Sequence, residues 1–206
     1  MGEQKVHQKG MFLLNKIFKN SQGITLVEVL ASITLFTIIS VLAVNIFVKA
    51  SETANNIQTD TELRDEADVI MSRFIKIIYS TNQNTIVRNI TNENDSYIEI
   101  TNDLSKCHKD ENENWIIDTE CQNTLKMVGF QTTGNITRIL FKDENYQINN
   151  NDIRISPESK INGDPESTTF YEIYLVLEKK TKQGNQTIQK KMIFKNNIQP
   201  LFSNGN

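Results

Sequence analysis

Residues 23–48 read GITLVEVLASITLFTIISVLAVNIFV, and the twenty positions after Glu28 carry no charged side chain. At a rise of ~1.5 Å per residue, about 20 helical residues cross the ~30 Å hydrocarbon core of a bilayer. Glu28 therefore stands at the entrance of a segment long enough to span a membrane. Because a carboxylate is costly at such a position, we expect Glu28 to have a specific partner.

The charged residues are divided unevenly around this apolar run. Of the 22 basic and 25 acidic residues, four lysines and one glutamate lie in residues 1–23, a net charge of +3; the 18 basic and 24 acidic residues that follow give −6. Positive residues before a membrane segment stay on the cytoplasmic side. The sequence therefore predicts a single-pass membrane protein with its N-terminus cytoplasmic. A secretory signal fits less well, since the run is long and no small-residue cleavage site follows it.

The string GITLVEVL at residues 23–30, preceded by the basic leader, resembles the processing motif of type IV prepilins and type II secretion pseudopilins. In that family a prepilin peptidase cuts the leader after the glycine, and the new N-terminal residue is methylated. The resemblance implies cleavage between Gly23 and Ile24 and N-methylation of Ile24. It also implies three kinds of partner: other pilins or pseudopilins, the prepilin peptidase/methyltransferase and an inner-membrane assembly platform.

Glu28 is the fifth residue of the mature chain that this resemblance implies. Cleavage would give Ile24 a cationic amine, and a buried carboxylate is tolerable when it meets a cation. We expect Glu28 to pair with that amine on a neighbouring subunit and so to set the axial register during assembly. The alternative is a carboxylate that reaches the lipid headgroups near the membrane face.

The apolar run continues into an amphipathic stretch without any proline or glycine before Gly129. We predict one helix from about Thr25 to about Tyr79, ended by the polar run at residues 81–84. Its part at 24–48 is the transmembrane or filament-core segment, and 49–80 is an amphipathic continuation. Apolar residues of the continuation recur every three or four positions, the pattern of a helix with one buried face: Leu63, Ala67, Ile70, Met71, Phe74, Ile75 and Ile78.

Residues 81–206 show strand-like alternation and polar turns, and they predict a β-rich extracytoplasmic head with a frayed tail at 200–206. The fold class expected is α+β: a long N-terminal helix packed against an antiparallel sheet, as in pilins. The clearest pair of strands flanks the turn at 182–185. The strands expected are 85–90, 97–101, 125–130, 136–142, 152–156, 169–178 and 187–195.

Two cysteines, Cys107 and Cys121, lie 14 positions apart in the head. Outside the cytosol they could form a disulfide, and a loop of ~15 residues would then stabilise the fold by ~3 kcal/mol in the chain-entropy model. The alternative is a pair of free thiols.

No cofactor and no catalytic constellation is expected, so the chain is not predicted to be an enzyme. The spacing of Asp110, Asn112, Asn114 and Asp118 resembles the start of a calcium loop, but Trp115 stands where an EF-hand needs glycine. A looser oxygen cage and a solvated acidic loop are the two interpretations.

Six lysines gather on the last predicted hairpin. Because the chain after residue 23 is acidic, nucleic-acid binding by this subunit alone is not expected; a charged edge that prevents strand-to-strand aggregation is the simpler interpretation. The six are Lys179, Lys180, Lys182, Lys190, Lys191 and Lys195.

The function predicted is that of a structural minor pilin or pseudopilin in a type IV pilus, a competence pilus or a type II secretion pseudopilus. The sequences VEVLA at 27–31 and LRDE at 63–66 are similar to those of J-type minor pseudopilins. The alternative is a single-pass, membrane-anchored surface adhesin or binding domain that does not polymerise.

Overall fold

A computed structural model of the chain describes residues 24–112, 114–148, 150–166, 170–183 and 186–201. It comprises two compact units, with the boundary between Ser51 and Glu52. Helix α2 runs from Leu26 to Tyr79, which confirms the single helix expected there, and it contributes residues to both units. The predicted leader at 1–23 and the end of the predicted tail at 202–206 lie outside the described residues.

In the first unit α2 is largely apolar, and each of its residues there except Ser40 is exposed. Among the described residues it is the one helix long and apolar enough to cross a membrane, and no residue of its most apolar 18-residue window is buried. The hydroxyls of Ser32, Thr34 and Ser40 donate to their own helix carbonyls, at 2.7–2.8 Å. These bonds satisfy the polar groups within the helix, as a segment in lipid requires.

In the second unit α2 supplies one side of the core. Its buried stripe consists of Leu63, Ala67, Ile70, Met71, Phe74 and Ile78, as the three-and-four spacing predicted, and Thr59 extends it by one turn. The expectation that Ile75 belongs to the stripe is wrong, since Ile75 is 40% exposed. At 3.6 residues per turn it lies ~100° round the helix from Phe74, outside the arc that the sheets cover.

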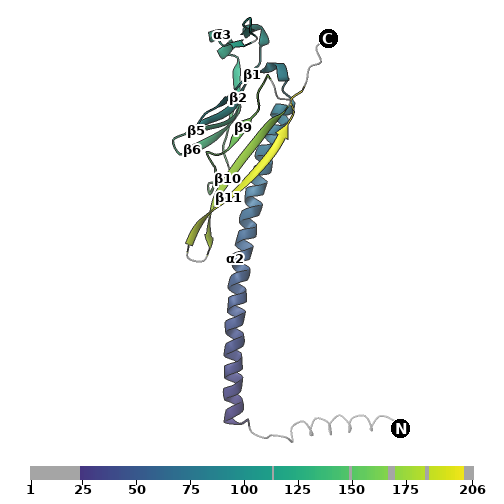
Figure 1. Cartoon of the computed structure of the whole chain (residues 1–206). Helices are drawn as coiled ribbons and strands as arrows, with labels where there is room; N and C mark the ends of the chain where they lie inside the picture. Colours follow the sequence, from purple (N-terminus) through teal and green to yellow (C-terminus); the bar gives the residue numbers. More distant parts are fainter. Residues whose placement is uncertain (1–23, 113, 149, 167–169, 184–185, 202–206) are drawn as a thin grey trace, which may run out of the picture. The chain divides into compact units, whose positions relative to one another are not determined.

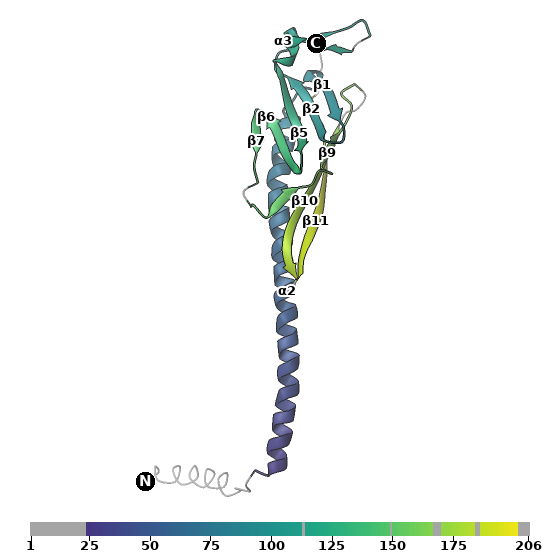
Figure 2. The same cartoon turned by 90° about the vertical axis from the view of Figure 1, so that its left-hand side faces the viewer.

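Two antiparallel sheets cover this stripe (Figures 1 and 2). One has the strand order β1-β2-β5-β6-β7, and the other has β11-β10-β8 with β9 also paired to β10. Their strands are β1 (Ile86–Thr91), β2 (Asp95–Thr101), β5 (Leu125–Thr133), β6 (Ile136–Lys142), β7 (Glu144–Tyr146), β8 (Ile153–Ile155), β9 (Lys160–Asn162), β10 (Tyr171–Gln183) and β11 (Gln186–Ile198). This arrangement is the α+β, pilin-like layout that the sequence predicted.

A small excursion between β2 and β5 contains the remaining elements, which the sequence analysis did not anticipate because each is only two to four residues long. They are η2 (Leu104–Lys106), β3 (His108–Lys109), β4 (Trp115–Ile116) and α3 (Thr119–Gln122). A further short helix, η1 (Gln83–Thr85), follows α2 and is capped by Asn82.

The two sheets are joined by side chains that bridge β9 to β2. Ser96 Oγ accepts a hydrogen bond from the Ile161 N–H at 2.9 Å and donates to the Ile161 carbonyl at 3.2 Å. Ser159 Oγ does the same for Val176 within the second sheet, at 3.0 and 3.2 Å. Both serines are buried. Buried backbone groups must be paired. Here the Ser96 and Ser159 hydroxyls bond the N–H and carbonyl groups of Ile161 and Val176, respectively.

The terminal hairpin is longer than the sequence indicated. Strand β10 continues to Gln183 and β11 to Ile198, in an unbroken register from Tyr171↔Ile198 to Gln183↔Gln186. Polar residues occupy most of the added length, so the sequence there shows no alternation of apolar and polar residues that would distinguish a strand from a loop. They are held in strands because the hairpin lies on α2, where Lys179 and Lys190 meet acidic side chains of the helix.

Phe74 is the residue on which this core is expected to depend most. Its ring is fully buried, with centroids 5.3 Å from Phe130 and 4.8 Å from Phe141. Phe74→Ala should lower the free energy of unfolding by ~3–5 kcal/mol, because it removes both ring contacts and leaves a cavity. The neighbouring Ile75→Ala is the matched control and should cost less than ~1 kcal/mol. Urea unfolding of the full chain in detergent, followed by circular dichroism, measures both; equal losses would contradict this packing.

Candidate processing and assembly segment

The start of α2 is closed by a reciprocal set of hydrogen bonds between Thr25 and Glu28. The Thr25 N–H donates to Glu28 Oε2 at 2.9 Å, and the Thr25 hydroxyl donates to the same oxygen at 3.0 Å. The Glu28 N–H in turn lies 3.3 Å from Thr25 Oγ1. This is a capping box, in which Thr25 is the N-cap and Glu28 is the third helical residue. The negative charge also lies at the positive end of the helix dipole.

The capping box gives Glu28 partners within its own chain. The sequence analysis assigned the glutamate an intermolecular partner alone and missed Thr25. The signal was present in the sequence as threonine, two intervening residues and glutamate directly before an apolar run. Both bonds come from Thr25, the residue next to Ile24. The carboxylate is therefore held beside the position where cleavage after Gly23 would create an amine; Gly23 itself lies outside the described residues.

Beyond the capping box, α2 presents apolar side chains on all sides. Phe36 and Phe47 are 73% and 75% exposed, and the other large apolar residues from Val29 to Val48 are 42–69% exposed. In water such a surface would be strongly unfavourable, at ~25 cal/mol for each Å². The segment is therefore suited to an apolar environment such as lipid.

A model of the prokaryotic N-terminal methylation motif matches residues 18–44, which include the predicted cleavage position, the capping box and most of the apolar run. This N-terminal match supports a place for the chain in the type IV prepilin and pseudopilin family. The motif and the apolar helix together support a processed, single-pass, membrane-anchored subunit of the pilin or pseudopilin type. No curated protein and no solved structure matches the chain significantly.

In the head, Cys107 and Cys121 are joined by a disulfide, with Cα atoms 4.7 Å apart. The bond closes the excursion that contains β3, β4 and α3, and both cysteines are buried. Lys109 lies over the Trp115 ring, with its Nζ 5.0 Å from the centroid, inside the closed loop. The excursion therefore forms a lobe that is covalently closed at its base.

The residues considered for calcium have structural partners in this lobe. Asp110 Oδ1 accepts the N–H groups of Asn112 and Asn114 at 2.9 and 2.8 Å, and these bonds, that to Asn114 first, lower the pKa of Asp110. Asp118 caps α3 by accepting the Cys121 N–H at 2.9 Å. Among the described residues no group of three or more His, Cys, Asp or Glu side chains is placed to hold a metal ion.

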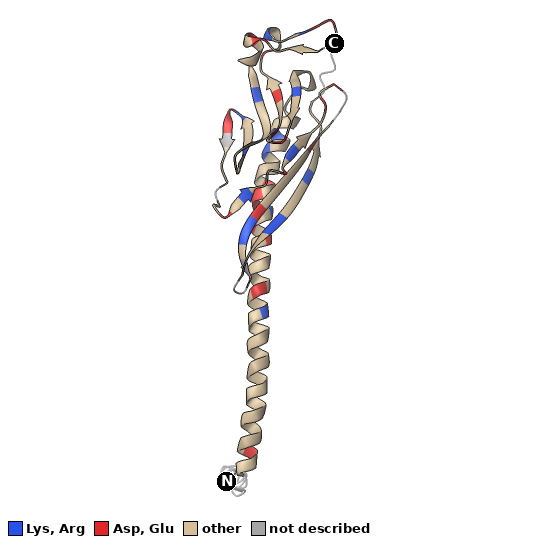
Figure 3. Ribbon diagram, turned by 60° about the vertical axis from the view of Figure 1, so that its left-hand side comes forward, with Lys and Arg blue, Asp and Glu red and all other residues tan. Residues whose placement is uncertain are grey.

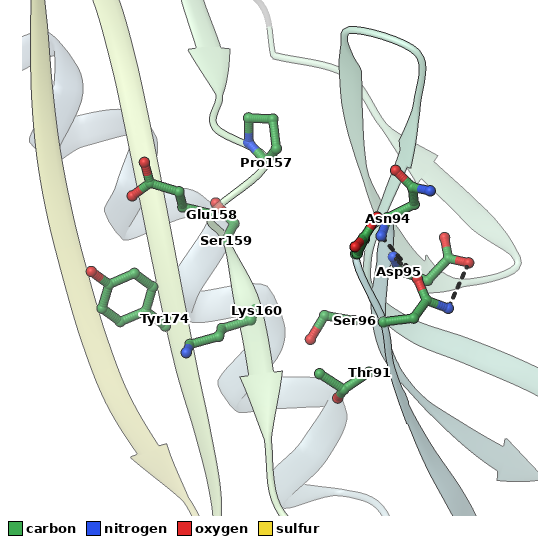
Figure 4. Close-up of a pocket in the computed structure, with 11 residues that line it drawn as sticks. Thr91, Asn94, Asp95, Ser96, Pro157, Glu158, Ser159, Lys160 and Tyr174 are labelled. Carbon is green, nitrogen blue, oxygen red and sulfur yellow. Dashed lines mark hydrogen bonds between the residues drawn. The ribbon is translucent and has the colours of Figure 1, made fainter.

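A polar cleft of about 370 Å³ lies between the β1–β2 turn and the segment that leads into β9 (Figure 4). Ser96 and Ser159 line it, but the Ser96 hydroxyl is used in the bonds that join the sheets and the Ser159 hydroxyl in bonds to Val176 within the second sheet. Asp95 accepts from Asn92 within the turn. The remaining groups, Lys160 and Tyr174, belong to the outer face of the hairpin sheet.

The lysine-rich hairpin is partly neutralised by its own chain. Lys179 pairs with Glu62 and Lys190 with Asp60, both on α2, and Lys191 pairs with Glu158 (Figure 3 shows the charges). Thr181 and Thr59 add a long hydrogen bond of 3.4 Å beside these pairs. The first two pairs connect the hairpin to the helix, and with the third pair they give half of the six lysines a structural role.

The Glu62–Lys179 pair makes the hairpin sensitive to acid. The hydrogen bond from Lys179 lowers the pKa of Glu62 below its ordinary 4.5. A depressed carboxyl pKa contributes stability above the unfolded value, and this contribution is lost as the pH falls from about 4.5 through the folded value. Hydrogen exchange of the β10 and β11 amides should therefore speed up below that pH. In Glu62→Gln the hairpin should exchange faster at neutral pH and change less on acidification; an unchanged acid response would contradict the assignment.

Proposed function

We propose that this chain is a minor pilin or pseudopilin that is cut between Gly23 and Ile24, methylated on Ile24, and assembled into a filament through residues 24–48. The observation that supports this most directly is the apolar surface of α2, exposed on every side and headed by Glu28. A membrane anchor alone would explain the apolar surface. The glutamate at the fifth position after the proposed cut is explained by processing.

In this proposal Glu28 has two successive partners. Before assembly its carboxylate accepts hydrogen bonds from Thr25, which satisfies it within the helix. During assembly it meets the Ile24 amine of a neighbouring subunit, where charge attraction is stronger because water is excluded. The capping geometry positions the carboxylate at the helix terminus for this exchange. The helix keeps its first turn through the Thr25 hydroxyl, which continues to accept the Glu28 N–H.

The proposed topology places the N-terminus in the cytoplasm and the head outside, where a disulfide between Cys107 and Cys121 is stable. The proposed partners are other pilins or pseudopilins, a prepilin peptidase/methyltransferase and an inner-membrane assembly platform. Assignment to a minor subunit, of the J type or another, rests on the amino-acid sequences at 27–31 and 63–66 and on the absence of proline from the apolar run.

N-terminal sequencing of the membrane-bound protein, with and without its prepilin peptidase, tests the processing step. The expected mature N-terminus is methylated Ile24, and the uncut chain should accumulate when the peptidase is deleted. A start at Met1 in both strains would favour the non-polymerising anchored adhesin. A start beyond Ala50 would favour secretion; either result overturns the proposal.

Two substitutions at Glu28 separate helix capping from ion pairing. Glu28→Gln keeps the capping box, since glutamine serves at the third helical position, but it removes the charge. Glu28→Ala removes both. If the ion pair drives assembly, both variants should be processed, yet both should co-assemble with other subunits at least ~10-fold less than wild type, because a buried amine is left unpaired. Wild-type assembly of Glu28→Gln, measured in sheared filament fractions, would reduce Glu28 to a helix cap.

A further inference from the structure

The register of the terminal hairpin divides its side chains between two faces. Residues of β10 that point to α2 include Leu175, Leu177 and Lys179, all buried or paired with the helix. The alternate residues face away from α2, and they form the cross-strand pairs Tyr174↔Lys195, Val176↔Ile193 and Glu178↔Lys191. The second set makes an outer face that the core does not use.

The centre of this outer face is apolar and its margin is basic. Ile193 is 50% exposed, with Lys191 and Lys195 two positions away on the same face of β11. The ammonium groups of Lys195 and Lys160 lie 4.9 and 5.6 Å from the centroid of the Tyr174 ring. We call Tyr174, Lys191, Ile193 and Lys195 the strand patch. Strand β11 is the last of its sheet, so the patch lies at an edge that another molecule can approach.

A surface of the opposite character lies on the side of α2 that faces away from the sheets. Asp65, Asp68, Val69 and Ser72 are exposed and lie within about a third of the helix circumference. Val69 is 45% exposed, and neither aspartate forms an ion pair with another described residue. We call these four residues the helix patch; Arg64 and Lys76 flank it.

We propose that the strand patch of one copy of this chain docks on the helix patch of the next copy. Each patch has an exposed branched aliphatic residue at its centre, beside two lysines on the strand patch and two aspartates on the helix patch. Such an arrangement suits an interface with an apolar core and complementary polar rim. The two patches are on different faces of one head, so the contact is heterologous. Repetition of a heterologous contact that does not close into a ring produces an open helical filament.

The inference rests on the proposed function, because it assigns to the head a contact that a filament subunit requires. A second copy fits the strand patch better than a nucleic acid does. Glu178 and Glu158 lie among the lysines, and Glu158 already pairs with Lys191. A polyanion would be repelled by these carboxylates. The helix patch instead offers two acidic groups for the two lysines and one aliphatic residue, Val69, for Ile193.

Charge reversal with rescue tests the contact in cells that produce the full chain. A cross-linkable cysteine at Ile193 and another at Val69 report contact between copies. Lys191→Glu with Lys195→Glu should reduce this cross-link roughly 10-fold, because like charges would face each other. Asp65→Lys with Asp68→Lys should do the same. Combining all four reversals in one chain should restore the cross-link. Reversal of two exposed lysines of the disulfide lobe, Lys106→Glu with Lys109→Glu, is the matched control and should change it less than twofold.

A second cysteine reporter within the apolar run, at Val41, separates failure of the contact from failure of the proposed function. A cross-link through Val41 without any between the patches would show that the chain assembles but by another head surface, and would overturn this inference alone. No cross-link at either place would overturn docking between copies, whereas the proposed function is decided separately by the N-terminal sequencing and by co-assembly with other subunits. A cross-link from the Ile193 position to a different protein, or salt-sensitive binding of single-stranded DNA that is lost on reversal of the strand-patch lysines, would also overturn docking between copies.

Discussion

The head depends on the burial of one face of α2 beneath two sheets. Phe74 contacts an aromatic ring from each of the adjacent strands β5 and β6, and the hairpin sheet adds Ile173, Leu175 and Leu177 to the same core. Neither sheet would be stable alone, since each would expose its apolar face to water. The helix is therefore the common surface that brings them together. The bonds between Ser96 and Ile161 become possible only once both sheets are in place.

The same helix meets two different requirements along its length. From Val29 to Val48 its side chains are uncharged and mostly apolar in every direction, and from Glu52 onward one face is apolar and the other polar. The change is visible in the sequence: no charged residue occurs between Glu28 and Lys49, and apolar residues recur every three or four positions after Lys49. Helix, membrane segment and buried stripe could therefore be predicted closely, with Ile75 the one error in the stripe.

Local pattern was a poorer guide in the head and at Glu28. Strand β6 was predicted to the residue, because its alternation is strong, but β7 and β9 were missed since three residues cannot establish a period. The hydrogen bond between Ser96 and Ile161 joins residues 65 positions apart, and no local sequence pattern predicts it. At Glu28 the signal was local, because Thr25 and Glu28 have the spacing of a capping box, but the sequence was interpreted only through a neighbour's amine or the lipid headgroups. The disulfide partners could be proposed from composition, while the cap that Asp118 gives to α3 could not.

The position of the two hairpin–helix ion pairs has a mechanical consequence. Glu62 and Asp60 lie just before Leu63, the first apolar residue of the buried stripe, beside the Thr59–Thr181 hydrogen bond. A force along the helix from its apolar part therefore reaches these links before it reaches the aromatic cluster. Ion pairs in contact with water break and re-form at small cost, unlike a packed aromatic cluster. A subunit under tension could thus release the end of its hairpin and recover it, while the rings around Phe74 stay in place.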